Sequence, residues 1–312
     1  MCIIKCINAH KCTFCTGLKM VSKSYQHAPL LMTLVDIRFS AIPDFYEAGK
    51  LTKLESSFRG IGFVEKVVEK LQEINFELTP DLEGNMVQSP KPQTNQSVKQ
   101  RWIFLNLEKT LSVYVAEDGL SIKSTEYTCH GNFVKLVADV ISKLTEVFPS
   151  LPQGITSRVG TRYLNLIIPM EGEEVSRYLK QEWLPNNSIP TEIDVESGVH
   201  NRLMMNYKTK YGNLRVESNK FTPEPGANMS IIPNELMDSP ETALTIQELP
   251  WWGGQLAKNE SYVVLDIDLS NPVREMFNSE NVINLLNEMR KLTRPAFDMC
   301  ITEEAKQDWV EL

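Results

Sequence analysis

Residues 155–168 read ITSRVGTRYLNLII, and the rest of the chain can be interpreted outward from this stretch. Its second part carries apolar side chains at Leu164, Leu166, Ile167 and Ile168, so it does not alternate as a strand with one solvated face does. A strand of this kind is typical of a sheet interior in which both faces are covered. We therefore expect this strand to lie buried at the junction between the two flanking parts of the chain.

The part that precedes this strand predicts a run of strands closed by a helix. Residues 30–39 alternate as a strand, and Pro43 opens a predicted helix that continues through Leu54. Residues 63–78 combine the periodicity of a helix in their first part with that of a strand in their second part. We favour a strand in the second part and leave the secondary structure of the first part open. Asp118-Gly119 predicts a hairpin. The remaining elements predicted from periodicity are strands at 101–107, 110–116 and 120–125 and a helix at 133–148.

The part that follows predicts the same order of elements. After the strand at 155–168 come a helix at 171–183, strands at 203–218, 227–232 and 262–269, and a closing helix at 282–292. Such runs of strands favour α+β over a doubly wound parallel sheet. The predicted fold is therefore α+β with two pseudo-repeated halves, residues 28–152 and 153–312, which are fused to each other. Each half is predicted to be an antiparallel sheet packed on a long helix.

Composition excludes several classes of protein. The chain has 312 residues, 42% of them hydrophobic, and a net charge of 32 − 40 = −8. These values are typical of a globular protein, and the negative charge argues against a protein that coats nucleic acid. No run of about 18 apolar residues predicts a membrane-spanning helix, and no signal peptide is recognisable. We expect a cytoplasmic protein without a membrane partner.

Residues 1–27 differ from the rest as a basic, cysteine-rich extension. They carry four lysines and no acid. Cys12 and Cys15 have the spacing of one half of a zinc site, so they are candidate metal ligands. A redox role is a second interpretation. The third, which we favour, is an extension without a packed role, with Met20 as an alternative start.

Charged strand residues are the next candidates. Asp266 and Asp268 lie two apart on a predicted strand and project to one face, where they could share a cation. The simpler interpretation is the solvated face of a half-buried strand. Arg162 is expected to pair with a strand carboxylate such as Asp36 or Asp266; an anion site is the alternative.

Trp251 and Trp252 form an aromatic pair in a late connection. Aromatic side chains are enriched at protein interfaces, so this pair is a candidate protein contact. The alternative is a loop folded back over the core. The chain contains neither a phosphate-binding glycine motif nor a recognisable nucleophile–base set, and it predicts no cofactor.

Six blocks of sequence occur in a fixed order along the chain: APL at 28–30, VDIRF at 35–39, RWIF at 101–104, RVGTRYLN at 158–165, LDID at 265–268 and FDMCITEE at 297–304. Together they resemble a sporadically distributed family of uncharacterised prokaryotic proteins of roughly 250 residues. The resemblance implies no established activity, but it implies frequent placement beside mobile or defence genes. It also implies an extended conformation near 63–78. Arg38 and Asp268 are positions at which this chain matches the family, and their role is unknown.

Three functions remain as hypotheses. The leading one is a non-enzymatic interaction protein, antitoxin-like or defence-associated, whose partner is another protein encoded by a neighbouring gene. The second is a small-ligand or nucleotide-sensing module with a pocket lined by Arg38, Arg162 and the acids. The third is a metal-assisted phosphoester enzyme that uses Asp266 and Asp268.

Overall fold

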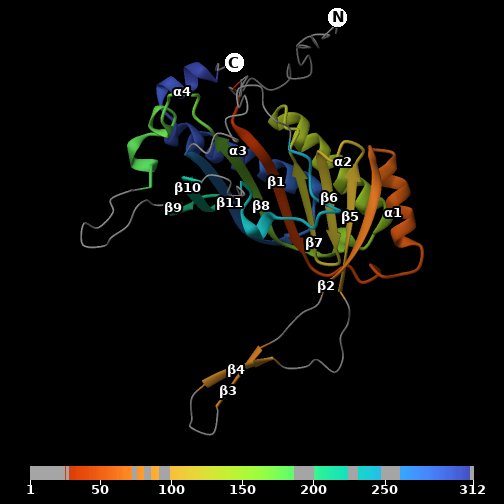
Figure 1. Cartoon of the computed structure of the whole chain (residues 1–312). Coiled ribbons are helices and arrows are strands. Elements are labelled where there is room, and N and C mark those ends of the chain that lie inside the picture. The colour runs from red at the N-terminus through yellow and green to blue at the C-terminus, as the bar shows by residue number, and fades with distance from the viewer. Residues whose placement is uncertain are drawn as a thin grey trace, which may run out of the picture.

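The computed structural model describes residues 25, 28–71, 76–80, 86–90, 99–185, 200–223, 231–246 and 261–309 (Figure 1). Within these residues the strands are β1 (Leu30–Phe39), β2 (Phe63–Leu71), β3 (Phe76–Pro80), β4 (Met86–Pro90), β5 (Lys99–Asn106), β6 (Leu111–Ala116), β7 (Gly119–Ser124), β8 (Ile155–Ile167), β9 (His200–Thr209), β10 (Gly212–Phe221) and β11 (Tyr262–Met276). The helices are α1 (Lys50–Arg59), α2 (His130–Val147), α3 (Ser279–Cys300) and α4 (Glu303–Asp308). Short 3₁₀ turns are η1 (Leu151–Gln153), η2 (Val175–Arg177), η3 (Gln181–Trp183) and η4 (Asn234–Leu236).

Nine of the strands form one continuous antiparallel sheet in the order β2-β5-β6-β7-β1-β8-β11-β10-β9. The prediction of two sheets, each packed on its own long helix, is therefore wrong. The two sets of strands join where β1 pairs with β8, for example at Val35 and Thr161. Alternation identifies the faces of a strand but not its neighbours, so the sequence pattern could not reveal this joint. β3 and β4 form a separate two-stranded sheet.

The strand at 155–168 was predicted correctly. β8 lies between β1 and β11, and its residues from Val159 to Ile167 are all buried. The predicted strands at 30–39, 101–107, 110–116 and 120–125 are also present, as β1, β5, β6 and β7. β6 and β7 form the expected hairpin, with Ala116 paired to Gly119.

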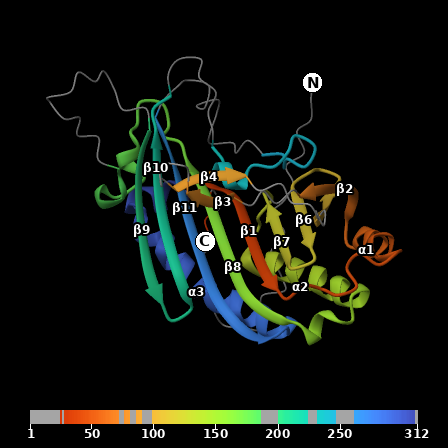
Figure 2. The same ribbon diagram turned by 90° about the horizontal axis from the view of Figure 1, so that it is seen from below.

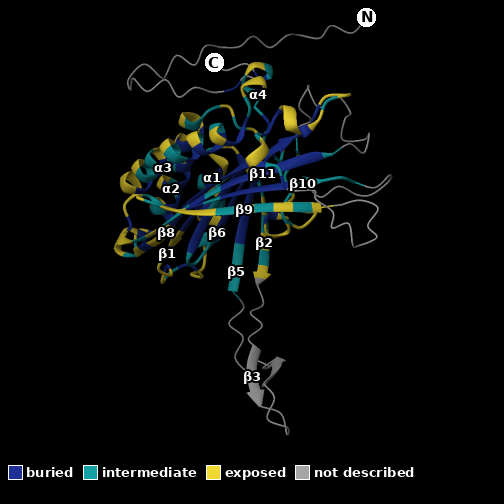
Figure 3. Ribbon diagram, turned by 90° about the vertical axis from the view of Figure 1, so that its left-hand side faces the viewer, coloured by how far each residue is buried: buried dark blue, intermediate teal, exposed yellow. Residues whose placement is uncertain are grey.

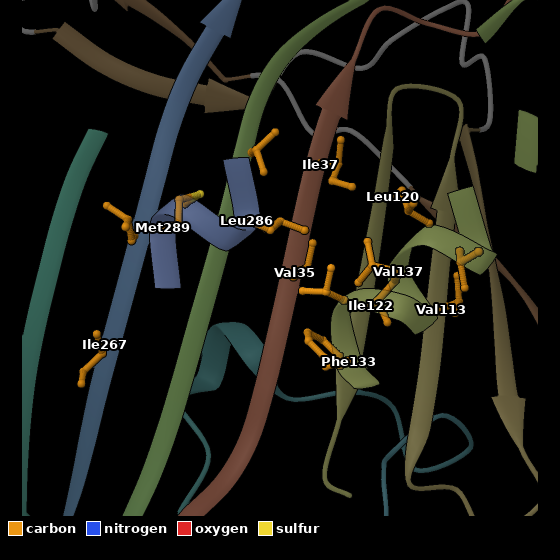
Figure 4. Packing of buried hydrophobic residues seen from close by; sticks show 14 of the residues in the cluster. Val35, Ile37, Val113, Leu120, Ile122, Phe133, Val137, Ile267, Leu286 and Met289 are labelled. Carbon is orange, nitrogen blue, oxygen red and sulfur yellow. The ribbon is translucent and has the colours of Figure 1, made fainter. Parts of the chain in front are cut away.

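The long helices pack on the same face of the sheet, as Figure 2 shows with the strands in front of them. Phe133 and Val137 of α2 lie over β1 and β7, while Leu286 and Met289 of α3 lie over the middle of the sheet (Figure 4). α2 also contacts α1 and α3. One hydrophobic core therefore spans residues from both parts of the chain. No helix in the described residues is long and apolar enough to cross a membrane.

Some predicted elements differ locally. Residues 171–183 form no α-helix but the turns η2 and η3, and Gly172 interrupts the segment with a φ of 81°. α1 begins at Lys50, after Gly49 with a φ of 85°, rather than at Pro43. The first part of residues 63–78, which we left open, is strand β2. Residues 227–230 of the predicted strand at 227–232 lie outside the described residues, and Ile231 and Ile232 are not in a strand.

The second face of the sheet is partly covered by residues 231–246, which we call the strap. Ile231, Ile232 and Ile246 pack on apolar residues of β1, β8 and β11, among them Leu166. Leu244 packs on Ile103, Leu105 and Tyr114 of β5 and β6. The strap thus crosses the second face from β11 to β5.

Beyond the strap, the second face is polar, and we call this part the open face. Its charged side chains are Arg38, Arg158, Lys208, Arg215, Asp36 and Asp268, which the strand registers place on one side of the sheet. No described element lies in front of this end of the strands in Figure 2. The central strands are mostly buried, whereas the edge strand β9 is intermediate to exposed (Figure 3).

Candidate functional site

A band of charged residues crosses the second face of the sheet from β7 to β10. Every second residue of a strand projects to the same side, so the registers decide which charges meet. Asp268 of β11 is paired in register with Arg162 of β8 on one side and with Arg215 of β10 on the other. Arg38 of β1 lies directly opposite Arg158 of β8. The band therefore brings together residues more than 100 positions apart in the sequence.

Arg162 and Asp266 form the buried centre of the band. The Arg162 Nε lies 2.9 Å from Oδ1 and 3.0 Å from Oδ2 of Asp266, and Nη2 lies 2.5 Å from Oδ2. The two side chains are only 9% and 1% exposed. Glu235 of the strap accepts a further hydrogen bond from Arg162 Nη2 at 2.8 Å. The predicted pairing of Arg162 with a strand carboxylate is thus confirmed, and the partner is Asp266.

Burial acts on both ionisable groups of this pair. It raises the pKa of the Asp266 carboxyl above its ordinary value, and the hydrogen bonds from Arg162 oppose that shift. Burial alone would lower the pKa of the Arg162 guanidinium, but the hydrogen bonds to Asp266 and Glu235 outweigh it and raise the pKa. Arg162 therefore stays charged, and its charge holds the ion pair together.

The two aspartates share a second arginine. Arg215 Nη2 lies 3.7 Å from Asp266 Oδ2 and 3.4 Å from Asp268 Oδ2. Asp266 is fully buried, so its interpretation as part of a solvated strand face is wrong; Asp268 is half-buried. No group of three or more metal-binding side chains occurs within the described ranges. The carboxylates are positioned to neutralise arginines.

The β1 side of the band has a different balance of charge. Arg38 Nε lies 3.2 Å and Arg158 Nη1 3.5 Å from the same atom, Oδ2 of Asp36. Ser121 donates to the other carboxylate oxygen, with a distance of 2.6 Å. The arginine side chains are 47% and 45% exposed, whereas that of Asp36 is 10% exposed. Two exposed cations thus share one nearly buried anion.

Glycines lie beneath both of these arginines. A Cβ atom at Gly119 would stand 3.0 Å from Arg38 Nη1 and 3.1 Å from its Cδ. A Cβ atom at Gly160 would stand 3.5 Å from Arg158 Nη2. The two guanidinium groups therefore lie close to the sheet surface, in positions that a bulkier neighbour at residue 119 would disturb.

Several residues of this band were not predicted from the sequence. Lys123 donates to Asp238 of the strap at 2.6 Å, in a pair whose side chains are 9% and 7% exposed. Glu235 and Asp238 fall in an irregular connection, where no periodicity indicates a contact. Arg215 sits on a predicted strand, so its alternation could have placed it on a face but not beside Asp266.

The other candidate sites are not joined to the band. Trp251, Trp252, Cys12 and Cys15 lie outside the described residues. A pocket of about 670 Å³ is lined by residues that include Glu173, Lys220 and Ser261, but by neither Arg38 nor Arg162. The predicted ligand pocket lined by these two arginines is not formed by that cavity.

Comparison with protein-family models finds none that matches the chain, and comparison with curated proteins finds no match either.

Proposed function

We propose that this chain is a non-enzymatic interaction protein that binds another protein through the open face. The antitoxin-like or defence-associated role, a partner encoded by a neighbouring gene and a cytoplasmic location belong to the same proposal.

One observation carries this proposal: in the described part of the chain, the aspartates considered for catalysis are already paired with arginines. Asp266 accepts hydrogen bonds from Arg162 and lies near Arg215, so its carboxylate is not available to hold a cation or to transfer a proton. A general base must reach a substrate proton within hydrogen-bond distance, and a carboxylate that is 1% exposed does not. This arrangement favours binding over catalysis.

The charge of the open face indicates the kind of partner. Arg38, Arg158, Lys208 and Arg215 supply four positive charges against the two negative charges of Asp36 and Asp268, an excess of 4 − 2 = +2. The whole chain, in contrast, has a net charge of −8. A basic surface on an acidic protein complements an acidic partner surface, and such complementarity governs specificity and association rate.

The test is binding of the products of neighbouring genes to the purified full-length chain and to two charge-reversal variants. Lys208→Glu changes the open face, and Lys135→Glu makes the same change on an exposed position of α2, on the opposite side of the sheet. We expect Lys208→Glu to weaken binding by about tenfold and Lys135→Glu to change it by less than about twofold.

Two results would contradict the proposal. If neither a neighbouring gene product nor any other protein binds the chain with measurable affinity, the interaction function is wrong. If a partner binds both variants equally well, the partner uses another surface and the assignment to the open face is wrong.

A further inference from the structure

We propose that Arg38 and Arg158 together bind a carboxylate group from an acidic segment of the protein partner. This inference rests on the proposed function and names the chemistry at one position of the open face.

The register at this position is unfavourable for folding by itself. Arg38 and Arg158 are directly opposite on neighbouring strands, and like charges in that arrangement destabilise a sheet. Asp36 relieves the repulsion only in part, since it offers one carboxylate to two guanidinium groups. Neither arginine is in the hydrophobic core, because each side chain is nearly half exposed. A local conflict of this kind is expected at a functional surface.

The donors of the two arginines are largely available to a ligand. A guanidinium group carries five N–H donors. Within the described residues, Arg38 uses Nε toward Asp36, and Arg158 uses Nη1 toward the same oxygen atom. Nearly half of each side chain is exposed, at the end of the sheet where β1 ends and β8 begins. Because Gly119 and Gly160 let the guanidinium groups lie close to the strands, a ligand can contact both.

The charge balance selects a carboxylate over a phosphate. Two guanidinium groups and Asp36 sum to 2 − 1 = +1, which one carboxylate neutralises. A phosphate dianion would leave negative charge beside Asp36, which is nearly buried. Arginine pairs with carboxylate and phosphate groups alike through two parallel hydrogen bonds, so the charge balance makes the distinction.

A nucleic acid fits the same surface less well. The wider band includes Asp266, Asp268 and Glu235 beside its arginines, so the positive charge does not continue along the sheet as a phosphate backbone requires. An acidic peptide segment needs only a local positive site. We therefore assign the partner contact to a glutamate or aspartate side chain.

The test uses acetylated hexaglutamate peptide as the probe, with binding to the full-length chain measured at low ionic strength. Arg38→Gln and Arg158→Gln should each weaken binding by about tenfold, because each removes one charged partner of the carboxylate. Arg59→Gln is the matched control, since Arg59 is an exposed arginine on α1 that already pairs with Glu55. It should change binding by less than about twofold.

A fourth variant reverses the sign of the expected effect. Asp36→Asn keeps the shape of the side chain but removes the internal carboxylate that competes for both arginines. The inference requires tighter hexaglutamate binding by Asp36→Asn. A purely structural role of Asp36 and its arginines would give weaker binding or none. Thermal melting checks folding, and Arg158→Gln should melt no lower than the original chain because it removes a like-charge contact.

Inorganic phosphate and a single-stranded DNA oligonucleotide are the competing probes. If either binds more tightly than hexaglutamate and depends on Arg38 and Arg158, the carboxylate assignment is overturned. It is also overturned if hexaglutamate does not bind, or if Arg59→Gln weakens binding as much as Arg158→Gln. A protein partner that is sensitive to Lys208→Glu but binds Arg38→Gln and Arg158→Gln normally would overturn this inference and leave the proposed function intact.

Discussion

At the scale of single residues, Arg162 links three separate parts of the chain. It lies on β8, pairs with Asp266 of β11 and reaches Glu235 of the strap. Taking a guanidinium and a carboxylate out of water is costly, and close hydrogen bonding offsets that cost only while both partners are present. The pair is therefore more sensitive to loss of one member than its net contribution to stability suggests.

We predict that Arg162→Ala lowers the free energy of unfolding by about 3–5 kcal/mol, because Asp266 would stay buried without its hydrogen-bonded partner. Urea denaturation of both proteins measures this difference. The matched control is Arg59→Ala, which removes an exposed i,i+4 pair with Glu55 and should cost less than about 1 kcal/mol. Unchanged stability with loss of partner binding would move Arg162 into the binding site.

His130, at the start of α2, should make stability depend on pH. Its Nε2 lies 3.0 Å from Asn287 Oδ1, and burial, with a smaller effect of Arg290, lowers its pKa to about 4. The unfolded chain binds the proton near the ordinary value of about 6.5, so the unfolded state takes up more protons between these values. The contribution of neutral His130 to the free energy of unfolding should be fully present above pH 6.5. It should fall by about 3 kcal/mol as the pH drops to 4.

Urea denaturation at a series of pH values checks this prediction. His130→Gln should remove most of the dependence between pH 6.5 and 4, whereas His200→Gln, on the edge strand β9, should retain it. The same loss of stability in His130→Gln as in the original chain would show that other groups are responsible.

At the scale of elements, the strap depends on a buried ion pair as well as on apolar contacts. Lys123 of β7 donates to Asp238 at 2.6 Å and to the backbone carbonyl of Leu236 at 3.1 Å. The Lys123 ammonium also lies 4.8 Å from the centre of the Tyr114 ring. Burial lowers the pKa of Lys123, which marks a charge that needs its partner.

We predict that Asp238→Ala destabilises the chain by about 3–5 kcal/mol, because it leaves the Lys123 charge buried without its carboxylate. The double variant Lys123→Met/Asp238→Ala should recover a large part of that loss, since it removes both charges. Urea denaturation gives the free energies, and amide exchange in residues 231–246 reports on the strap. Equal stability of the single and double variants would show that the ion pair does not hold the strap.

At the scale of the whole molecule, the junction of β1 and β8 makes the sheet continuous. The two strands pair from Leu30 to Phe39, and the core under the sheet contains side chains from both parts of the chain. Removal of residues 153–312 would expose the whole edge of β1, including the buried Val35 and Ile37. A long unpaired edge strand with apolar residues promotes aggregation.

We therefore predict that residues 28–152 alone do not form a stable monomer. Size-exclusion chromatography should detect aggregates or an expanded chain, and amide exchange should reveal little protection of β1. The full-length chain, measured in the same way, is the control. A monomeric fragment with well-protected amides in β1 would contradict the prediction and would divide the chain into two independent domains.

Sequence patterns were sufficient where the responsible forces are local. The alternation of 30–39, the two-sided burial of 155–168 and the hairpin at 118–119 follow from side-chain period and turn chemistry. The pairing of Arg162 with a strand carboxylate followed from the cost of an unpaired buried charge. Patterns failed at 171–183, where the chain forms the turns η2 and η3 after Gly172, whose φ is 81°.

The sequence by itself therefore determined most of the strands, the two longest helices and the need of Arg162 for a carboxylate, because each depends on neighbours along the chain or on burial alone. Only the tertiary structure decided that the strands form one sheet, that α2 and α3 share one face of it, and that Lys123 meets Asp238 115 residues away. It also decided that Arg38 and Arg158 stand opposite each other. The physical reason is that periodicity specifies which side of a strand is buried, whereas the choice of neighbouring strand depends on packing of the whole core.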